Sequence, residues 1–398
     1  MPKVCITGIG IICAAGSNSS EVLKSLAEKR TGIGHLSLIQ SIYKDEIPAG
    51  EIKKSNEELY NLANPDIRGY YSRTALLGLI AVTQAIRQAA LSNADLEQTA
   101  LISGTTVGGM DRTEVFYDTF RLNHNKGKIK LAAGHDCGAG TEDIARNLGI
   151  NGFQSTINTA CSSSANAIMM GARLIQHGKA KRVIAGGTDS LTKFTLNGFN
   201  SLMILDREQC RPFDDTRNGL NLGEGSGFLV LESEEVVGSK PVLAVVKGWG
   251  NACDAYHQTA SSPDGNGAYL AMQKALQTAG IQTSDIQYIN THGTGTKNND
   301  LSEGIAIERL FSTGIPPCSS TKSYTGHTLG AAGGIEAVFS VLAIQNHCIF
   351  PNLNFNTKMQ ELGFEPAREF TTGTRISHVM SNSFGFGGNN SSLIFSEA

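Results

Sequence analysis

Residues 158–167 read NTACSSSANA and join a short extended run, residues 154–158, to a helix-like stretch at residues 168–177. A cysteine at the first turn of a helix faces the positive end of the helix macrodipole, which lowers the pKa of its thiol and favours the thiolate. Small neighbouring residues allow backbone N–H groups to face an incoming oxygen atom. We therefore predict that Cys161 is a nucleophile that attacks carbonyl carbons, and the alternative is a buried structural cysteine.

The composition excludes several classes of protein. The 398 residues carry a net charge of -3, are 40% hydrophobic and 17% charged, and contain no blocks of basic residues, so we expect a globular protein that binds no nucleic acid. The 8 cysteines show neither C-x-x-C pairs nor histidines at zinc spacing, so we expect reduced thiols and no metal. The sequence has no signal-peptide pattern and no apolar run of about 18 residues, which predicts a cytoplasmic protein without a membrane span.

Outward from the cysteine stretch, predicted strands alternate with predicted helices. The order of strand, long helix, strand and functional loop occurs twice, which predicts two halves, residues 1–241 and 242–398. Such alternation predicts an α/β fold whose sheets are covered by helices. We expect strands at residues 4–13, 99–106, 154–158, 181–187, 228–232, 242–249, 286–290, 317–321, 378–383 and 392–395, and long helices at residues 72–91, 267–280 and 329–346.

Two histidines lie in loops that follow predicted strands of the second half. His292 lies in THGTGT, residues 291–296, and His327 ends KSYTGH, residues 322–327. Active sites of α/β sheets gather at the carboxyl ends of strands, and Cys161 also follows a strand. A single histidine in such a loop is more often structural. Two of them together with a cysteine at a helix start favour nucleophilic or decarboxylative catalysis.

Three acidic residues near these loops need an explanation. Glu336 lies in an otherwise apolar helix, where a carboxylate requires a partner, and Lys322 is the simplest choice. Asp300 and Glu303 follow the His292 loop, and they either orient the site or cap the next helix.

A glycine turn near the C-terminus carries two large rings. Phe384 and Phe386 lie in FGFGGN, residues 384–389. One interpretation is a hairpin-like turn. The other is a turn whose backbone N–H completes an oxyanion hole together with the N–H of Cys161.

Four motifs occur in an order that resembles a known family. They are TACSS at residues 159–163, THGTGT at 291–296, KSYTGH at 322–327 followed by GAAG at 330–333, and NSFGFGG at 382–388. Together they resemble the β-ketoacyl-[acyl carrier protein] synthases of the elongating I/II type, in the thiolase superfamily. The resemblance implies a thiolase-like five-layer αβαβα fold built from two similar halves. It also implies a homodimer, or a heterodimer with a related subunit.

The resemblance further implies a reaction and roles for individual residues. Cys161 would hold an acyl group as a thioester, and a decarboxylative Claisen condensation with malonyl-[acyl carrier protein] would lengthen it by two carbons. His292 and His327 would stabilise the enolate, and Lys322 would fix the site through Glu336. No cofactor is implied besides the phosphopantetheine of the acyl carrier protein, which is the partner. The remaining roles are contact with that arm for Thr294 and Thr296, gating for Phe384, an oxyanion N–H for Phe386, an acyl pocket for Val107 and Phe199, and support of the site for Asp300 and Glu303.

The sequence also departs from the pattern of that family. Residues 297–300 read KNND where the family usually has T-P-x-G-D, and Phe153 stands where the family commonly has proline. Residues 136–143 are small and polar for a region that borders the acyl pocket. Specialised polyketide or polyene synthesis is therefore an alternative to fatty acid synthesis. A non-condensing partner subunit or acyl-binding protein, or a degradative thiolase, are alternatives for the activity.

Overall fold

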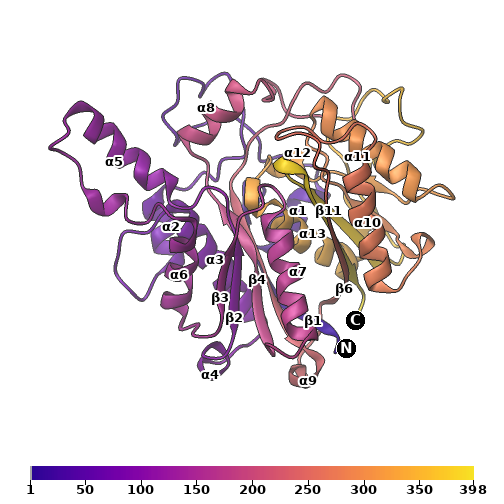
Figure 1. The fold of residues 1–398 in the computed structure, drawn as a ribbon, viewed down its shortest axis with the longest axis horizontal. Coiled ribbons are helices and arrows are strands. Elements are labelled where there is room, and N and C mark those ends of the chain that lie inside the picture. The colour runs from indigo at the N-terminus through magenta and orange to yellow at the C-terminus, as the bar shows by residue number, and fades with distance from the viewer. Residues whose placement is uncertain (1) are drawn as a thin grey trace.

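A 10-stranded sheet runs through the computed structural model, which describes residues 2–398, in the order β3-β2-β4-β5-β1-β6-β12-β11-β7-β8 (Figure 1). It consists of two halves that meet where Cys5 and Ile6 of β1 pair with β6. Counted along the chain within each half, the strands follow the order 3-2-4-5-1 in both. The parallel and antiparallel pairings also agree between the halves. The predicted α/β fold of two similar halves is confirmed.

The strands extend close to the segments expected from the sequence. A separate two-stranded sheet pairs β9 with β10. The bounds are β1 Val4–Cys13, β2 Ala100–Gly104, β3 Gln154–Ile157, β4 Arg182–Asp189, β5 Gly225–Ser233, β6 Ala244–Cys253, β7 Tyr288–Asn290, β8 Cys318–Ser319, β9 Cys348–Ile349, β10 Thr371–Thr372, β11 His378–Phe384 and β12 Asn389–Ser396.

Helices cover both faces of the two half-sheets and give the five-layer α-β-α-β-α arrangement. α7 (Ser163–Gln176) and α13 (Ala332–Asn346) pack against each other between the half-sheets. α3 (Arg73–Gln88) covers β1 and β5 from outside, and α10 (Asn266–Ala279) covers β6 and β12 (Figure 1). The other helices are α1 Ser19–Ala27, α2 Asn56–Ala63, α4 Asn93–Leu96, α5 Met110–Leu122, α6 Cys137–Leu148, α8 Lys193–Ser201, α9 Glu234–Val237, α11 Lys297–Leu310 and α12 Lys322–Thr325, with 3-10 turns η1 Ile129–Leu131, η2 Thr283–Asp285, η3 Leu329–Ala331 and η4 Phe386–Gly388.

Glycines allow α13 to lie against its neighbours in the central layer. A Cβ atom on Gly333 would lie 2.9 Å from the backbone N of Ala165 in α7, and one on Gly334 would lie 2.4 Å from the carbonyl oxygen of Gly227 in β5. A larger residue at either position would push the layers apart. The expectation that no apolar run reaches about 18 residues is wrong, because the stretch Leu329–Asn346 is long and apolar enough to cross a membrane. However, 89% of it is buried inside the protein, which is typical of a core helix.

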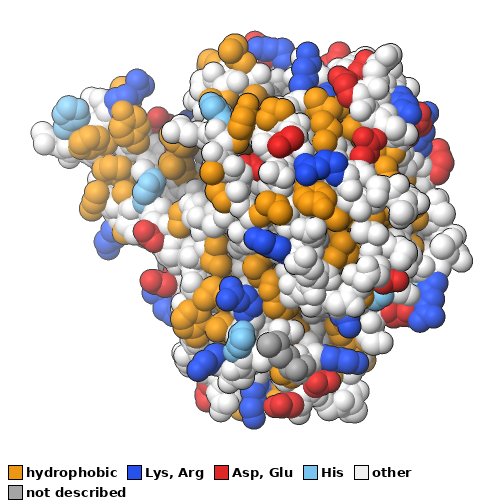
Figure 2. Space-filling view, turned by 45° about the vertical axis from the view of Figure 1, so that its right-hand side comes forward, with side chains coloured by type: hydrophobic (Ala, Val, Ile, Leu, Met, Phe, Trp, Pro, Cys, Tyr) orange, Lys and Arg blue, Asp and Glu red, His pale blue; other side chains and the backbone are white. Residues whose placement is uncertain are grey.

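One arm of the first half projects away from the layers. It contains α5, none of whose residues is buried, and hydrophobic side chains gather on its surface (Figures 1 and 2). Val115, Tyr117, Leu122 and Ile129 are 56%, 57%, 83% and 68% exposed. Exposed apolar groups that are this close together are typical of a surface that another protein covers.

Candidate active site

Cys161 lies in a sharp turn between β3 and α7. Ala160 adopts a left-handed φ of 53°, a conformation that residues other than glycine rarely take and that is common at functional turns. The hydroxyl of Ser163 donates to the carbonyl of Ala160 at 2.6 Å and accepts from the N–H of Thr159 at 2.9 Å, which closes the turn. α7 begins at Ser163, so Cys161 precedes the helix, and the prediction that it lies in the first helical turn is wrong.

The pKa of the Cys161 thiol corrects a second expectation. Burial raises this pKa to about 11, although the N–H of Phe386, the charge of Lys322 and the N–H of Cys161 itself all lower it. The sulfur is removed from solvent, so desolvation outweighs the effects of the two N–H groups and of Lys322. The resting residue is therefore a thiol, and the predicted thiolate is wrong for this state.

His292 and His327 lie beside this thiol. The sulfur of Cys161 and one ring nitrogen of each histidine all lie within 4.8 Å of one another. The centroids of the two imidazoles are 5.3 Å apart and their planes are nearly perpendicular, at 86°. Burial, with the positive charge of Lys322 as a further cause, lowers the pKa of both histidines well below the usual value. Both rings are therefore neutral near neutral pH.

Hydrogen bonds determine which ring nitrogen carries the proton. Lys322 Nζ lies 3.2 Å from His292 Nδ1, and the N–H of Leu329 donates to His327 Nδ1 at 3.0 Å. An ammonium group and a backbone N–H are donors only, so both Nδ1 atoms accept and both Nε2 atoms carry hydrogen. The two histidines thus offer two neutral N–H donors in one place.

Lys322 lies behind His292. The predicted ion pair between Lys322 and Glu336 is present, and the side chains are only 2% and 3% exposed. Lys322 Nζ also donates to the carbonyl oxygen of His292 at 2.6 Å. Burial raises the pKa of Glu336 to about 6, against the lowering by Lys322. The lysine therefore orients both the ring and the backbone of His292.

Asp300 and Glu303 hold the loop that carries His292. Both lie inside α11, which is capped by the hydroxyl of Thr296, so the capping interpretation is wrong for both. Burial raises the pKa of Glu303 to about 7 and that of Asp300 above its usual range. Glu303 accepts from the N–H groups of His292 and Gly293 at 2.9 and 2.8 Å. Asp300 accepts from the N–H groups of Gly295 and Phe213 at 3.2 and 2.8 Å.

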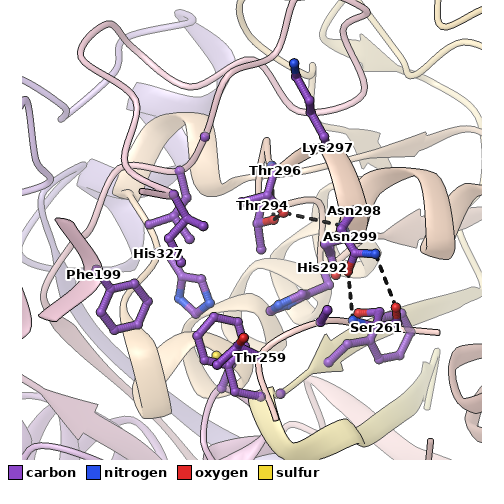
Figure 3. A pocket seen from close by; sticks show the side chains of 18 of the residues that line it. Phe199, Thr259, Ser261, His292, Thr294, Thr296, Lys297, Asn298, Asn299 and His327 are labelled. Atoms are coloured by element: carbon purple, nitrogen blue, oxygen red, sulfur yellow. Dashed lines mark hydrogen bonds between the residues drawn. The ribbon is translucent and has the colours of Figure 1, made fainter. Parts of the chain in front are cut away.

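Two cavities meet at Cys161. The larger has a volume of about 380 Å³ and is lined by both histidines (Figure 3). The smaller, of about 270 Å³, is mostly apolar and is also lined by Cys161. The rings of Phe199 and Phe386 stack at a centroid distance of 5.9 Å and line both cavities. Of the other residues predicted to contact substrate, Thr294, Thr296 and Phe384 line the larger cavity and Val107 lines the smaller one.

One hydrogen-bonded connection at the exposed end of the larger cavity was not predicted. The N–H of Ser261 donates to Oδ1 of Asn298 at 2.8 Å, and Nδ2 of Asn298 donates to the carbonyl of Ser261 at 3.2 Å (Figure 3). Thr259 and Ala260, next to Ser261, also line this cavity. The sequence showed only that residues 297–300 depart from the family pattern. It gave no sign of a partner 37 residues away.

Both halves of the chain match one known family. Residues 1–236 match its description "Beta-ketoacyl synthase, N-terminal domain", and residues 243–356 match "Beta-ketoacyl synthase, C-terminal domain". The chain belongs to the β-ketoacyl synthase family. The predicted boundary between residues 241 and 242 lies between the two matches, and it stays a prediction.

Individual relatives agree with this assignment. The chain is 33% identical over 411 residues to 3-oxoacyl-[acyl-carrier-protein] synthase 2 of Staphylococcus aureus, a match that covers 99% of this chain and 98% of the relative. The solved ishigamide ketosynthase/chain length factor is similar with a TM-score of 0.94 and 29% identity, over 100% of this chain and 99% of that one. A ketosynthase solved in complex with its chain length factor, from Xenorhabdus doucetiae, has a TM-score of 0.84 and 32% identity, over 100% and 98%. The predicted thiolase-like fold and the predicted class of condensing acyltransferase are confirmed.

The side chains of Cys161, His292 and His327 are also of the kinds that bind zinc. Lys322 Nζ lies 3.2 Å from His292 Nδ1, and its positive charge opposes a divalent cation there. The expectation of a metal-free site stays a prediction.

Proposed function

We propose that this ketosynthase joins an acyl group held on Cys161 to the two-carbon unit of malonyl-[acyl carrier protein], with loss of CO2. The observation that carries this proposal is the cluster of one sulfur and two imidazole nitrogens within 4.8 Å, at the junction of two cavities. One cavity can hold an acyl chain while the other admits the arm of a carrier protein. Both substrates then meet at the cysteine, and the product is a 3-oxoacyl-[acyl carrier protein] two carbons longer.

In the first half-reaction, the sulfur of Cys161 attacks the carbonyl carbon of an acyl thioester. A new C–S bond forms to Cys161, the C–S bond to the phosphopantetheine thiol breaks, and the thiol proton of Cys161 ends on the departing thiol. The backbone N–H groups of Cys161 and Phe386 lower the pKa of the thiol, and we assign them as the donors to the negative oxygen that develops beside the sulfur. Loss of one such donor costs about 10²–10³ in rate in known enzymes.

In the second half-reaction, the bond between the malonyl carboxylate and its methylene carbon breaks. CO2 leaves, and the electron pair becomes an enolate whose charge lies on the thioester oxygen. The Nε2–H groups of His292 and His327 donate to that oxygen and give up no proton, so the carbon remains nucleophilic. It attacks the acyl carbonyl on Cys161, the new C–C bond forms, and the Cys161 sulfur leaves and takes a proton from water.

The two cavities provide for the two parts of the substrate. The hydroxyls of Thr294 and Thr296 lie 2.9 Å apart and suit the polar phosphopantetheine arm. Val107 and Phe199 bound the acyl chain in the smaller cavity. The ring of Phe384 lies 5.9 Å from that of His292 and lines the larger cavity, where we assign it the role of a gate for the acyl chain. This arrangement serves fatty acid synthesis or a related polyketide or polyene pathway.

A second candidate function is that of a non-condensing partner subunit or acyl-binding protein. Similarity to structures that include a chain length factor favours it. The buried cluster of Cys161 with two oriented imidazoles favours the enzyme instead, because binding alone needs neither a nucleophile nor enolate donors.

We also propose that the protein acts as a dimer in the cytoplasm and needs no resident cofactor. The apolar arm around α5 and the edge strand β3, whose residues are all partly or fully exposed, support contact with a second copy or with a related subunit. The chain has a mass of 42.2 kDa, so light scattering of the purified protein should give about twice this value. A monomer at micromolar concentration would count against a homodimer.

One experiment tests the enzymatic proposal directly. The purified protein is incubated with an acyl-[acyl carrier protein], and intact mass and peptide mass are measured. We expect one acyl adduct, located on Cys161. Addition of malonyl-[acyl carrier protein] should then remove the adduct, release CO2 and give a 3-oxoacyl product. No adduct would leave the partner subunit as the better candidate, and an adduct that free acetyl-CoA alone extends without CO2 would point to a thiolase.

A further inference from the structure

A buried carboxylate lies next to the wall of the smaller cavity and has no role in the mechanism above. Asp189 is the last residue of β4, is 0% exposed, and is absent from the described linings of the two cavities. Ionised carboxylates are strong hydrogen-bond acceptors, and a buried one requires several donors. The donors to Asp189 are Thr105 Oγ1 at 2.5 Å, Thr106 N at 3.0 Å, Thr106 Oγ1 at 2.8 Å, Val107 N at 3.0 Å and Gly330 N at 2.7 Å.

One of these bonds leads to His327. Gly330, whose N–H donates to Asp189, directly follows Leu329, which has a left-handed φ of 52°. The N–H of Leu329 is the donor to His327 Nδ1, at 3.0 Å. An unfavourable φ at a leucine persists only where its surroundings hold it. The bond from Gly330 to Asp189 is therefore part of what keeps the Leu329 N–H directed at the histidine.

The backbone at Gly330 packs tightly against Asp189 and Thr106. A Cβ atom on Gly330 would lie 2.8 Å from Asp189 Oδ2 and 3.0 Å from the backbone N of Thr106. The other bonds of Asp189 fix the Thr105–Val107 turn, and Val107 and Leu329 both line the smaller cavity. One carboxylate thus connects the wall of that cavity to the segment that orients His327.

We propose that Asp189 is a positioning residue for the decarboxylation half-reaction and acts through Leu329 on His327. This inference rests on the function proposed above. Without the carboxylate, the Leu329 N–H leaves His327 Nδ1. The ring can then carry its hydrogen on Nδ1, and it loses the Nε2–H that stabilises the enolate.

The inference predicts a selective defect. Acyl transfer to Cys161 uses the N–H groups of Cys161 and Phe386, and neither residue hydrogen-bonds to Asp189. Enolate formation uses His327. A small displacement of a catalytic group can cost about 10²-fold in rate. Loss of Asp189 should therefore slow CO2 release by about ten- to a hundredfold while acylation stays within about twofold.

The test compares the two half-reactions in Asp189→Asn, which keeps the shape of the side chain but turns one oxygen into a donor. Acylation is followed by the mass of the Cys161 adduct, and CO2 release is followed from malonyl-[acyl carrier protein]. Nitrogen-15 NMR of labelled histidine reports the tautomer directly, and the His327 signal should move away from the Nε2–H form. Glu232→Gln is the matched control, because this carboxylate is also buried in the first half but bonds to Thr7, Arg182 and Lys240 instead.

The outcomes separate the inference from the function. A wild-type protein that releases no CO2 overturns the proposed function. An active wild type with an Asp189→Asn variant whose two half-reactions fall equally, or not at all, overturns the inference alone. If Asp189→Asn fails to fold, Gly330→Ala carries the test, because the added methyl group separates the same two residues. It should give the same selective loss, and an unchanged rate of CO2 release would contradict the role of Asp189.

Discussion

The two halves of the molecule share a strand order but place different chemistry at corresponding strand ends. In the first half, β3 leads through residues 158–162 into α7 and presents Cys161. In the second half, the corresponding strand β8 leads through residues 320–331 into α13 and presents Lys322 and His327. The longer second connection makes room for a cation and an imidazole where the first has only a thiol.

The other corresponding strands show the same division. β2 leads to the Val107 turn beside the acyl cavity, whereas β7 leads to His292. β4 ends at Asp189, which holds a cavity wall, whereas β11 ends at Phe384, which lines the other cavity. The side chains that contact substrate therefore divide between the halves: those of the first half receive and hold the acyl group, and those of the second half stabilise negative charge, with Asp189 acting across this boundary on His327. Variants in each half should separate these two tasks.

The largest effect is expected for the nucleophile. Cys161→Ala should abolish the acyl adduct and all condensation, because no other group in the cluster can form a thioester. It should retain CO2 release from malonyl-[acyl carrier protein], because both histidines remain. Intact mass and CO2 assays measure the two activities. Cys253→Ala, at an exposed cysteine, is the control and should behave as wild type. Loss of CO2 release together with acylation would contradict the division between the halves.

The next largest effect is expected for the enolate donors. His327→Ala or His292→Ala should lower the rate of CO2 release by about 10²–10³, the usual effect of removing one donor to a developing oxyanion. Formation of the acyl adduct on Cys161 should change far less. The comparison is made by single-turnover measurement of each half-reaction. A histidine variant that fails to acylate but still releases CO2 would show that the imidazoles serve the thiol instead.

The pH dependence sharpens the contrast between the resting thiol and the neutral imidazoles. Burial raises the pKa of Cys161 to about 11, so the thiolate fraction grows as pH rises. Alkylation of Cys161 by iodoacetamide should therefore accelerate by about tenfold per pH unit between about pH 8 and 10. Peptide mass spectrometry separates Cys161 from Cys253. A plateau below about pH 8 would show that the thiolate is already formed.

The two histidines make the stability of the fold depend on pH at the acidic end, whereas the thiol changes its reactivity at the alkaline end. The folded-state pKa values of His292 and His327 lie well below the usual value, so the unfolded chain binds protons first as the pH falls. Their contribution to the free energy of unfolding is therefore complete above about pH 6.5 and is lost as the pH decreases below it. Urea denaturation at several pH values should show the decrease, and a His292→Gln, His327→Gln double variant should show less of it.

Local chemistry explains how much of this site could be predicted. Cys161, His292 and His327 each lie in a short motif at a strand end, and a carboxylate within an apolar helix made Lys322 the natural partner of Glu336. The raised pKa of the thiol could not be predicted, because burial depends on the packing of both halves. The bond from Gly330 to Asp189 joins residues 141 positions apart and has no local pattern. The alternation of strands and helices is a local pattern. It therefore predicted the fold, but it carried no information about contacts between residues far apart in the chain.

The smallest effect is expected at the connection between Asn298 and Ser261, which likewise had no sequence pattern. Asn298→Ala should loosen residues 259–261 at the exposed end of the larger cavity and raise the KM for carrier-bound substrates. The variant loses both hydrogen bonds to Ser261, and even one contributes about 0.5–1.5 kcal/mol, so the increase should be at least about two- to tenfold, with kcat nearly unchanged. Asn298→Asp keeps the acceptor for the Ser261 N–H and loses the donor, so it should fall between alanine and wild type. Asn298 also lies in α11, whose Glu303 accepts from the N–H of His292. A lower kcat at constant KM would therefore show that Asn298 helps to position the His292 loop and does not contribute to substrate binding.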